Sequence, residues 1–143
     1  MTSENEGPPA TRSWKPRLAH TMLRVRDLDR SLHFYVDLLG MQVLRSTDYP
    51  DGEFTNTFIS YGPESDYPAI ELTHNWGKAE AYTHGDGYGH IALDVHGFCQ
   101  YLASAGVKIT RPPGPMKHGT RILAFLEDPD GYKVEIAQPY RSD

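Results

Sequence analysis

Apolar and polar residues alternate along the first ordered-looking segment of the chain, and this alternation predicts a β-strand. The strand is expected from Leu18 to Val25, with His20, Met22 and Arg24 on one face and the residues between them on the other. Because Leu23 and Val25 are among the latter, that face should lie against a core. The face that carries His20 should then be the polar one.

The next segment has a helical period. Asp27 can cap a helix, and Gly40 can end it. The apolar residues that recur at about this spacing are Leu28, Leu32, Val36 and Leu39. The sequence therefore predicts one amphipathic helix between the first strand and the rest of the sheet.

Three further strands are predicted in the first half, at residues 41–45, 55–61 and 69–74. In the third of them, Ile70 and Leu72 point one way while Glu71 and Thr73 point the other. Glu71 is thus expected on the polar face of its strand, as His20 is on its own strand.

The second half repeats this order. A strand is predicted from Gly89 to Val95 with His90 on its polar face, then a helix over 98–105 that ends at Gly106, and a strand at 107–110. Strands at 121–127 and 132–138 form a hairpin across Asp128-Pro-Asp-Gly131, and the second strand has Lys133 and Glu135 on its polar face. The fold class is therefore α+β, with two tandem βαββ(β) units that meet near residues 76–88. Units of this size should share one core or pair with a second chain.

Composition narrows the function classes. The 143 residues include 14 Lys and Arg and 19 Asp and Glu, so the net charge is −5. A protein with this charge has no positive electrostatic field to attract a nucleic-acid backbone. One cysteine, Cys99, excludes a disulfide framework within the chain. The sequence has no apolar signal core or membrane-spanning run, which favours a cytoplasmic location. Residues 1–16 are predicted to be a flexible tail, 17–138 a single domain of two modules (about 17–76 and 88–138), and 139–143 a short C-terminal tail.

Four polar residues occupy matching places in the repeat: His20 and His90 early in the first strand of each unit, Glu71 and Glu135 in the last. Any one of them alone would be an ordinary surface residue. A solvated face has no reason to repeat a His/Glu pair, however, and two imidazoles with two carboxylates suit a divalent transition metal. Cys99 and the remaining histidines are expected to have structural roles. These histidines are His33, His74, His84, His96 and His118.

Several motifs resemble the glyoxalase I (lactoylglutathione lyase) family of bacterial type, within the vicinal oxygen chelate superfamily. They are His20-Thr-Met-Leu-Arg-Val, Asp27-Leu-Asp-Arg-Ser31, Leu38-Leu39-Gly40-Met41, Ile70-Glu-Leu-Thr73, Tyr88-Gly-His-Ile-Ala-Leu93 and Glu127-Asp-Pro-Asp-Gly-Tyr-Lys-Val-Glu-Ile136. The resemblance covers about Arg17 to Gln138. It implies tandem βαβββ modules in a homodimer whose active sites form across the subunit interface.

The resemblance also implies a chemistry. Metal ligands are carried onto His20, Glu71, His90 and Glu135, two from each chain, with Ni²⁺ or Co²⁺ favoured and Zn²⁺ possible. The reaction is isomerisation of the hemithioacetal of methylglyoxal and glutathione to S-lactoylglutathione through an enediolate, a detoxification of methylglyoxal without a redox cofactor. Glu135 is expected to take the proton and Glu71 to assist its return. Anchors for the glutathione carboxylates are expected at three positions: Arg24, Asn75 and Lys117.

Departures from the family pattern concern the contacts to the thiol and do not include the four candidate ligands. Asp86 lies where some relatives have a basic glutathione contact, His74 where a tyrosine is common, and the helix over 98–105 is about one turn short. Alternatives are another metalloenzyme of the superfamily (an epimerase, a dioxygenase or a thiol transferase), a metal-free small-molecule-binding protein, or a silent dimeric scaffold. The sequence leaves open the metal, the thiol and the role of the tail.

Overall fold

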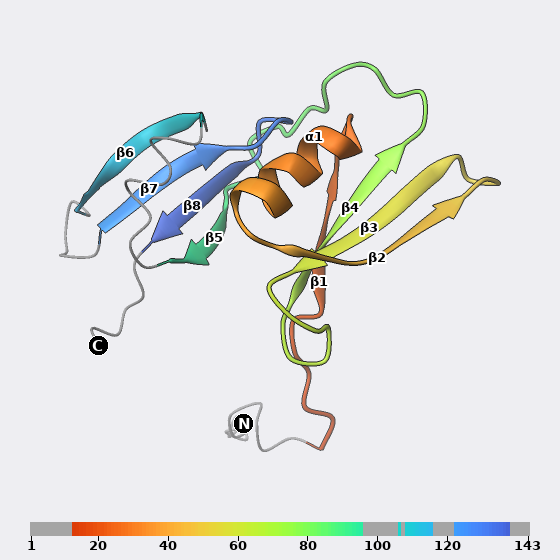
Figure 1. The fold of residues 1–143 in the computed structure, drawn as a ribbon, viewed down its shortest axis with the longest axis horizontal. Helices are drawn as coiled ribbons and strands as arrows, with labels where there is room; N and C mark the ends of the chain where they lie inside the picture. The colour runs from red at the N-terminus through yellow and green to blue at the C-terminus, as the bar shows by residue number, and fades with distance from the viewer. Residues whose placement is uncertain (1–12, 96–105, 107, 116–121, 138–143) are drawn as a thin grey trace, which may run out of the picture.

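Two four-stranded sheets make up most of the computed structural model, which describes residues 13–95, 106, 108–115 and 122–137 (Figure 1). The first sheet contains β1 (His20–Arg24), β2 (Gln42–Tyr49), β3 (Phe54–Ser60) and β4 (Ala69–Asn75). The second contains β5 (Ile91–Asp94), β6 (Ile109–Pro115), β7 (Ile122–Glu127) and β8 (Lys133–Ala137). The predicted helix over 98–105 lies outside the described residues, as do Lys117 and Cys99.

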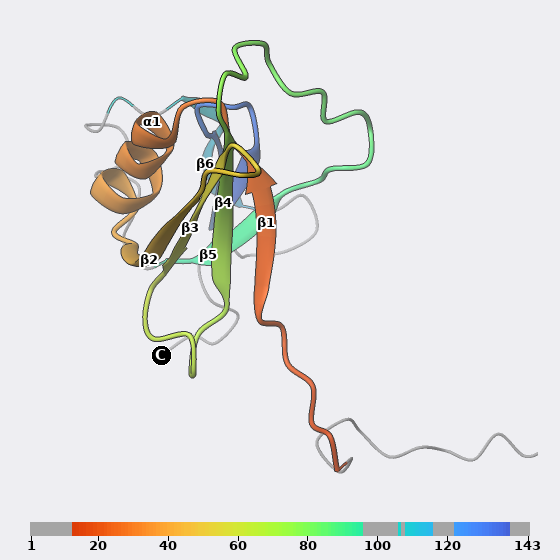
Figure 2. The same ribbon diagram turned by 90° about the vertical axis from the view of Figure 1, so that its right-hand side faces the viewer.

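The two sheets have the same topology, which confirms the tandem repeat. Their strand orders are β1-β4-β3-β2 and β5-β8-β7-β6. In each, the first strand pairs in parallel with the last and the other neighbours are antiparallel. The connection between the sheets, residues 76–90, arches away from the ends of β1 and β4 before it reaches β5 (Figure 2).

The helix predicted after Asp27 is present, and its buried face differs from the aliphatic stripe. It consists of α1 (Leu28–Leu32) and the π-helical η2 (His33–Leu38), and Asp27 caps it by accepting a hydrogen bond from the Arg30 backbone N–H at 3.1 Å. Ser31 and Tyr35 are fully buried, whereas the leucines of the stripe are only partly buried. Figure 2 shows the helix to one side of the strands of both sheets. No helix in the described part of the chain is long and apolar enough to cross a membrane.

Strand β2 is longer than the predicted strand at 41–45, and its extension is polar. From Arg45 onward its residues pair with β3 as far as Tyr49. Ser46 and Asp48 hydrogen-bond across the strands to Thr57 and Thr55, at 2.8 and 2.7 Å. Side-chain pairing, rather than apolar alternation, therefore holds this edge. The strand predicted at 107–110 is likewise observed as β6, which begins at Ile109.

One hydrophobic core serves both modules, as the size of each unit predicts. Its buried members come from β1, the helix, β3 and β4 on one side and from β7 and β8 on the other; the largest fully buried aliphatic and aromatic ones are Val25, Tyr35, Ile59, Leu72, Leu126, Val134 and Ile136.

A buried carboxylate joins the two modules. Asp128, which is 5% exposed, accepts a hydrogen bond from the Tyr35 hydroxyl at 2.7 Å. Its other oxygen accepts from the backbone N–H groups of Asp130 and Tyr132, at 2.9 and 2.8 Å. The turn between β7 and β8 is thus tied to the helix of the first module.

Two further contacts extend this connection to the end of β1. Asp130 accepts hydrogen bonds from the backbone N–H of Arg26 at 3.1 Å and from its Nε at 3.4 Å. The Tyr132 hydroxyl donates to the carbonyl of Arg24 at 2.9 Å. The strand that carries His20 and the strand that carries Glu135 are therefore held together in one chain at their ends.

Replacing Asp128 tests this connection. Asp128→Leu should lower the free energy of unfolding by about 3 kcal/mol, because it leaves the Tyr35 hydroxyl and two backbone donors without their acceptor. Asp128→Asn keeps an oxygen for the backbone donors and should cost less than about 1 kcal/mol. Urea unfolding of both variants measures the difference. Equal losses would contradict the hydrogen-bonding role.

The carboxyl of Asp128 also makes the stability of the protein depend on pH. Burial raises the pKa of Asp128 above its ordinary value of 3.8, against the opposing effect of its hydrogen bonds. In the folded state the Asp128 carboxyl therefore resists ionisation. Its contribution to the free energy of unfolding is complete at lower pH and is lost as the pH rises through the raised pKa. The stability of the parent relative to Asp128→Asn should therefore fall as the pH rises from the ordinary carboxyl pKa of 3.8 through the raised pKa of Asp128, and then level off.

Candidate metal centre

The first His/Glu pair lies on adjacent strands of the first sheet. His20 is the first residue of β1, and Glu71 lies in β4, opposite Met22 of β1. Because Met22 is two residues from His20, all three side chains lie on one face. The Nε2 atom of His20 is 3.0 Å from Oε2 of Glu71. The predicted parity thus places these two side chains together.

The second pair repeats this geometry in the second sheet. His90 directly precedes β5, and Glu135 in β8 lies opposite Ala92. Their Nε2 and Oε2 atoms are 2.8 Å apart. Both pairs have 43% of the histidine side chain and 14% of the glutamate side chain exposed. The duplication therefore extends from topology to side-chain geometry.

An aromatic and a basic residue extend the first pair across its sheet. Phe58 of β3 lies opposite Glu71, and its ring meets that of His20 edge-on, with centroids 5.2 Å apart. Arg45 of β2 lies opposite Phe58, with its guanidinium carbon 3.8 Å from the ring centroid. Glu64 accepts two hydrogen bonds from Arg45, at 3.2 and 3.3 Å. The row from His20 to Arg45 crosses all four strands.

The second sheet has an equivalent row. Phe125 of β7 lies opposite Glu135 and meets His90 edge-on at 5.3 Å. Arg111 of β6 lies opposite Phe125, and a register shift precedes it just as one precedes Arg45. Sequence reasoning missed both phenylalanines and both arginines. The signal that could have found them is their strand position opposite a candidate ligand, which requires the register of the sheet.

Each His/Glu pair supplies half of a donor set that fits a divalent transition metal. Each pair supplies one imidazole nitrogen and one carboxylate oxygen, the donor types that such ions accept. In the described residues of a single chain, no three metal-binding side chains gather at one place. The structure thus brings His20 to Glu71 and His90 to Glu135, and it does not bring the two pairs together within one chain.

The predicted thiol anchors lie at the far ends of the same strands. Arg24 is the last residue of β1 and is exposed, on the face of His20. Asn75 is the last residue of β4, and its Nδ2 donates to the Tyr82 hydroxyl at 3.2 Å. Tyr82 lies in the long connection, where no pattern in the sequence would indicate it. The third predicted anchor, Lys117, is outside the described residues.

Three other histidines have the structural roles that the sequence predicts. His74 points to the side opposite Glu71, with Nδ1 3.4 Å from the carbonyl of Val25. His33 is exposed and pairs with Asp37 at 3.0 Å. His84 stacks on Tyr132, with ring centroids 4.1 Å apart. His96 and His118 lie outside the described residues.

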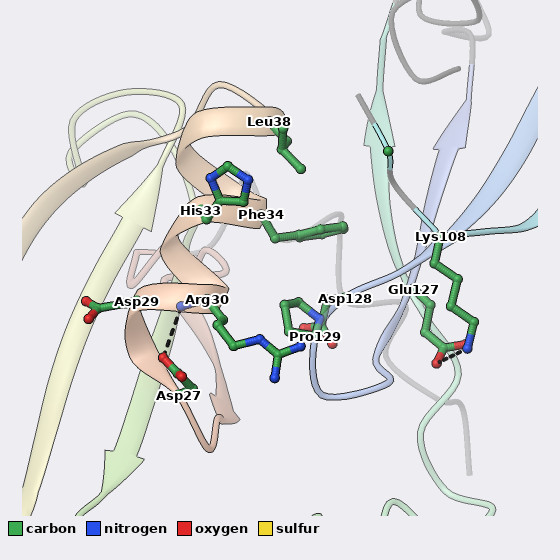
Figure 3. A pocket seen from close by; sticks show the side chains of 11 residues that line it. Asp27, Asp29, Arg30, His33, Phe34, Leu38, Lys108, Glu127, Asp128 and Pro129 are labelled. Carbon is green, nitrogen blue, oxygen red and sulfur yellow. Dashed lines mark hydrogen bonds and ion pairs between the residues drawn. The ribbon is translucent and has the colours of Figure 1, made fainter. Parts of the chain in front are cut away.

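A cavity of about 650 Å³ lies elsewhere, between the helix and the β6–β7 side of the second sheet (Figure 3). Its wall includes the Lys108–Glu127 ion pair, at 3.0 Å, together with Arg30 and two further acidic side chains of the helix start. None of the four candidate ligands lines it. The predicted chemistry therefore does not belong to this cavity.

Comparison with known proteins shows the family to which the chain is similar. Residues 17–136 match the Glyoxalase/Bleomycin resistance protein/Dioxygenase superfamily. The chain is 57% identical over 124 residues to a probable lactoylglutathione lyase of Synechocystis sp., which covers 85% of this chain and 94% of that protein.

Solved structures lead to the same group. Glyoxalase I from Zea mays matches with a TM-score of 0.80 and 45% identity over 89% of this chain, although the chain spans only 45% of the maize protein. The trypanothione-dependent glyoxalase I of Leishmania major matches with a TM-score of 0.75 and 40% identity over 86% of each chain. The chain therefore belongs to the glyoxalase I (lactoylglutathione lyase) family of the Glyoxalase/Bleomycin resistance protein/Dioxygenase superfamily.

Proposed function

We propose that this protein is a metal-dependent glyoxalase I, which isomerises the hemithioacetal of methylglyoxal and glutathione to S-lactoylglutathione. The observation that carries the proposal is the His/Glu pair, repeated with the same exposure and nearly the same distance at equivalent points of two sheets. The names of the relatives, lactoylglutathione lyase and glyoxalase I, support it.

The metal would be held by His20, Glu71, His90 and Glu135. A divalent ion bound there supplies Lewis acidity, which stabilises negative charge on two neighbouring oxygens of the substrate. The donor types suit several ions, so the preference for Ni²⁺ or Co²⁺ over Zn²⁺ rests on the resemblance to bacterial forms.

The carboxylates move the proton. Glu135 takes it from the carbon bonded to sulfur, and Glu71 assists its delivery to the neighbouring carbon, while the hydroxyl proton passes from one substrate oxygen to the other. The result is a thioester beside a new alcohol, with no net oxidation. A carboxylate at each side of the substrate lets the proton leave one carbon and return to the next.

A homodimer with sites at the subunit interface would complete the donor set. Each chain has two half sites on different sheets, and a two-fold axis that places the first half of one chain against the second half of its partner makes two complete sites. The separation of the pairs within the chain supports this arrangement.

The thiol is proposed to be glutathione, with Arg24 and Asn75 as anchors for its polar groups. The name of the Leishmania relative shows that the thiol differs within the family. The third anchor, Lys117, the flexible tails at 1–16 and 139–143, and the cytoplasmic location stay predictions.

A metal-free binding protein of the same fold is the second candidate. The retention of both His/Glu pairs disfavours it, because a protein that only binds a small molecule has no need of four donors in matching places. An epimerase, a dioxygenase or a thiol transferase would need a substrate other than the hemithioacetal.

A direct assay tests the proposal. The protein is stripped of metal, reloaded with Ni²⁺, Co²⁺ or Zn²⁺, and mixed with preformed hemithioacetal while thioester formation is followed by absorbance. Turnover should depend on the metal and survive in His33→Ala, whose exposed pair with Asp37 lies outside the proposed site. Absence of turnover with all three ions would refute the proposal.

A further inference from the structure

The ring of His20 makes one polar contact with the residues that the structure describes. This contact joins its Nε2 atom to Glu71, at 3.0 Å. A ring nitrogen that coordinates a metal ion cannot also donate a hydrogen bond, so a bound ion would remove this contact. Metal-binding histidines are usually oriented by a hydrogen bond from their second ring nitrogen. For His20, the described contact that remains is the one with the ring of Phe58.

Phe58 reaches His20 from β3, across β4. The planes of the two rings lie at 89° to each other, with centroids 5.2 Å apart. An edge-on pair at this distance is more favourable than its buried area alone would make it. Phe58 is 7% exposed, so close packing leaves its ring little freedom to move away. The ring of His20, with 43% of the side chain exposed, is thus restrained from the side of Phe58.

Arg45 covers a face of the Phe58 ring. Its guanidinium carbon is 3.8 Å from the ring centroid, which is the geometry of a cation–π contact. Arg45 also pairs with Glu64, but both side chains of that ion pair are exposed, so the pair contributes little to stability. The contact with Phe58 is therefore the one through which Arg45 can act on His20.

The second sheet repeats the aromatic contact. Phe125 meets His90 edge-on, with ring centroids 5.3 Å apart. The polar contact of the His90 ring with the described residues is again a single one, with Glu135 at 2.8 Å. Both phenylalanines lie opposite the glutamate of their own pair. The recurrence at equivalent points of the repeat indicates a role that the two histidines share.

We propose that Phe58 and Arg45 are positioning residues for the metal ligand His20. Phe58 fixes the orientation of the imidazole ring, and Arg45 acts through Phe58 by keeping the phenyl ring in place. A phenyl ring and a guanidinium offer no donor to a cation, so both residues should change the affinity for the metal without binding it. This inference rests on the proposed function, and it concerns the assembly of the metal site rather than the transfer of the proton.

Nickel binding to the metal-free protein measures the effect. The Kd for Ni²⁺, obtained by competition with a coloured chelator, should rise about tenfold in Phe58→Leu, because a residue that orients a metal ligand is lost. Arg45→Met should raise it about threefold, whereas Arg45→Lys, which keeps a cation above the ring, should stay within about 1.5-fold of the parent. The double variant Phe58→Leu/Arg45→Met should lose no more affinity than Phe58→Leu alone, because Arg45 acts through the ring. Additive losses would overturn the role of Arg45.

Phe54→Leu and Arg30→Met are the matched controls. Phe54 lies four residues before Phe58 on the same face of β3, and its ring stacks on Tyr49, with centroids 4.8 Å apart. Arg30 is an exposed arginine of α1. Both variants should keep the Kd for Ni²⁺ within about 1.5-fold of the parent, because neither side chain is in the row that contains His20. A loss of affinity in Phe54→Leu as large as that in Phe58→Leu would reveal a merely structural effect and overturn the proposal.

A spectroscopic measurement reports the position of the His20 ring without metal or turnover. Nuclear Overhauser effects between the ring protons of His20 and Phe58 are expected in the metal-free parent and in Arg45→Lys, and they should be weaker in Arg45→Met. Unchanged values of the Kd for Ni²⁺ in both Phe58→Leu and Arg45→Met would refute the inference, even in an active enzyme. Absence of turnover in a parent that binds Ni²⁺ would refute the proposed function, whereas the changes in Kd would still support the positioning of His20.

Discussion

Replacing Glu135 by glutamine is expected to lower kcat with the glutathione hemithioacetal by at least about a thousandfold. Glutamine keeps the size of the side chain and one acceptor oxygen, but it cannot take a proton at neutral pH. It is also a poorer metal ligand than a carboxylate. Glu135 lies 2.8 Å from His90, and its side chain is 14% exposed.

Metal content separates the two roles of Glu135. Both kcat and bound metal are measured at saturating Ni²⁺ or Co²⁺, so that loss of the base is scored on fully loaded protein. The control is Glu64→Gln, which removes an exposed partner of Arg45 and should keep kcat within about twofold. Near-normal turnover of loaded Glu135→Gln would rule out its role as the base.

Glu71→Gln provides the comparison within the site. The side chain of Glu71 has the same exposed fraction as that of Glu135, and it lies 3.0 Å from His20, which is equivalent to His90. Because Glu71 only assists the return of the proton, Glu71→Gln should lower kcat less than Glu135→Gln does, by about a hundredfold. A larger loss in Glu71→Gln than in Glu135→Gln would reverse the assignment of the two carboxylates.

The donor pairs could be predicted from the sequence because strand parity is fixed by the backbone. His20 and Glu71 both lie opposite the aliphatic residues of their strands, and the βα connection brings the first strand of each module beside the last. The same argument gave His90 and Glu135. Local alternation and a repeat were sufficient for these four positions.

The rest of the row required information that lies in the pairing of strands. Arg45 reaches the face of Phe58 because the register shifts between Val43 and Arg45, which leaves Leu44 without a partner across the ladder. No periodicity in residues 41–45 indicates such a shift. The polar extension of β2 escaped prediction for a related reason, since cross-strand hydrogen bonds stabilise it in place of apolar burial.

The sequence also did not indicate that Asp128 connects the two modules. The motif from Asp128 to Gly131 predicts a turn, and Gly131 has the positive φ of 86° that such a turn uses. The bonds from Asp128 to Tyr35 and from Asp130 to Arg26 span about a hundred residues, and only the packing of one module on the other creates them. A local motif could not show that this turn joins the modules.

A mixture of His20→Ala and His90→Ala chains is expected to regain about a quarter of the parent activity per chain, although each variant alone is inactive. With random exchange, half of the dimers contain one chain of each kind. If sites are shared between subunits, such a dimer has one site with both histidines and one with neither. Subunits are exchanged under mild denaturation, and activity is measured after the heterodimer fraction has been determined with affinity tags.

The same experiment with the first pair alone is the control. A mixture of His20→Ala and Glu71→Ala should recover nothing, because in the heterodimer each chain damages a different site. Sites confined to one chain would leave both mixtures inactive. The pattern of recovery therefore reports which donors act together: His20 with Glu71 from one subunit, and His90 with Glu135 from its partner. No recovery in verified His20→Ala/His90→Ala heterodimers would refute the shared site, since the separation of the pairs within a chain would then have no partner to bridge it.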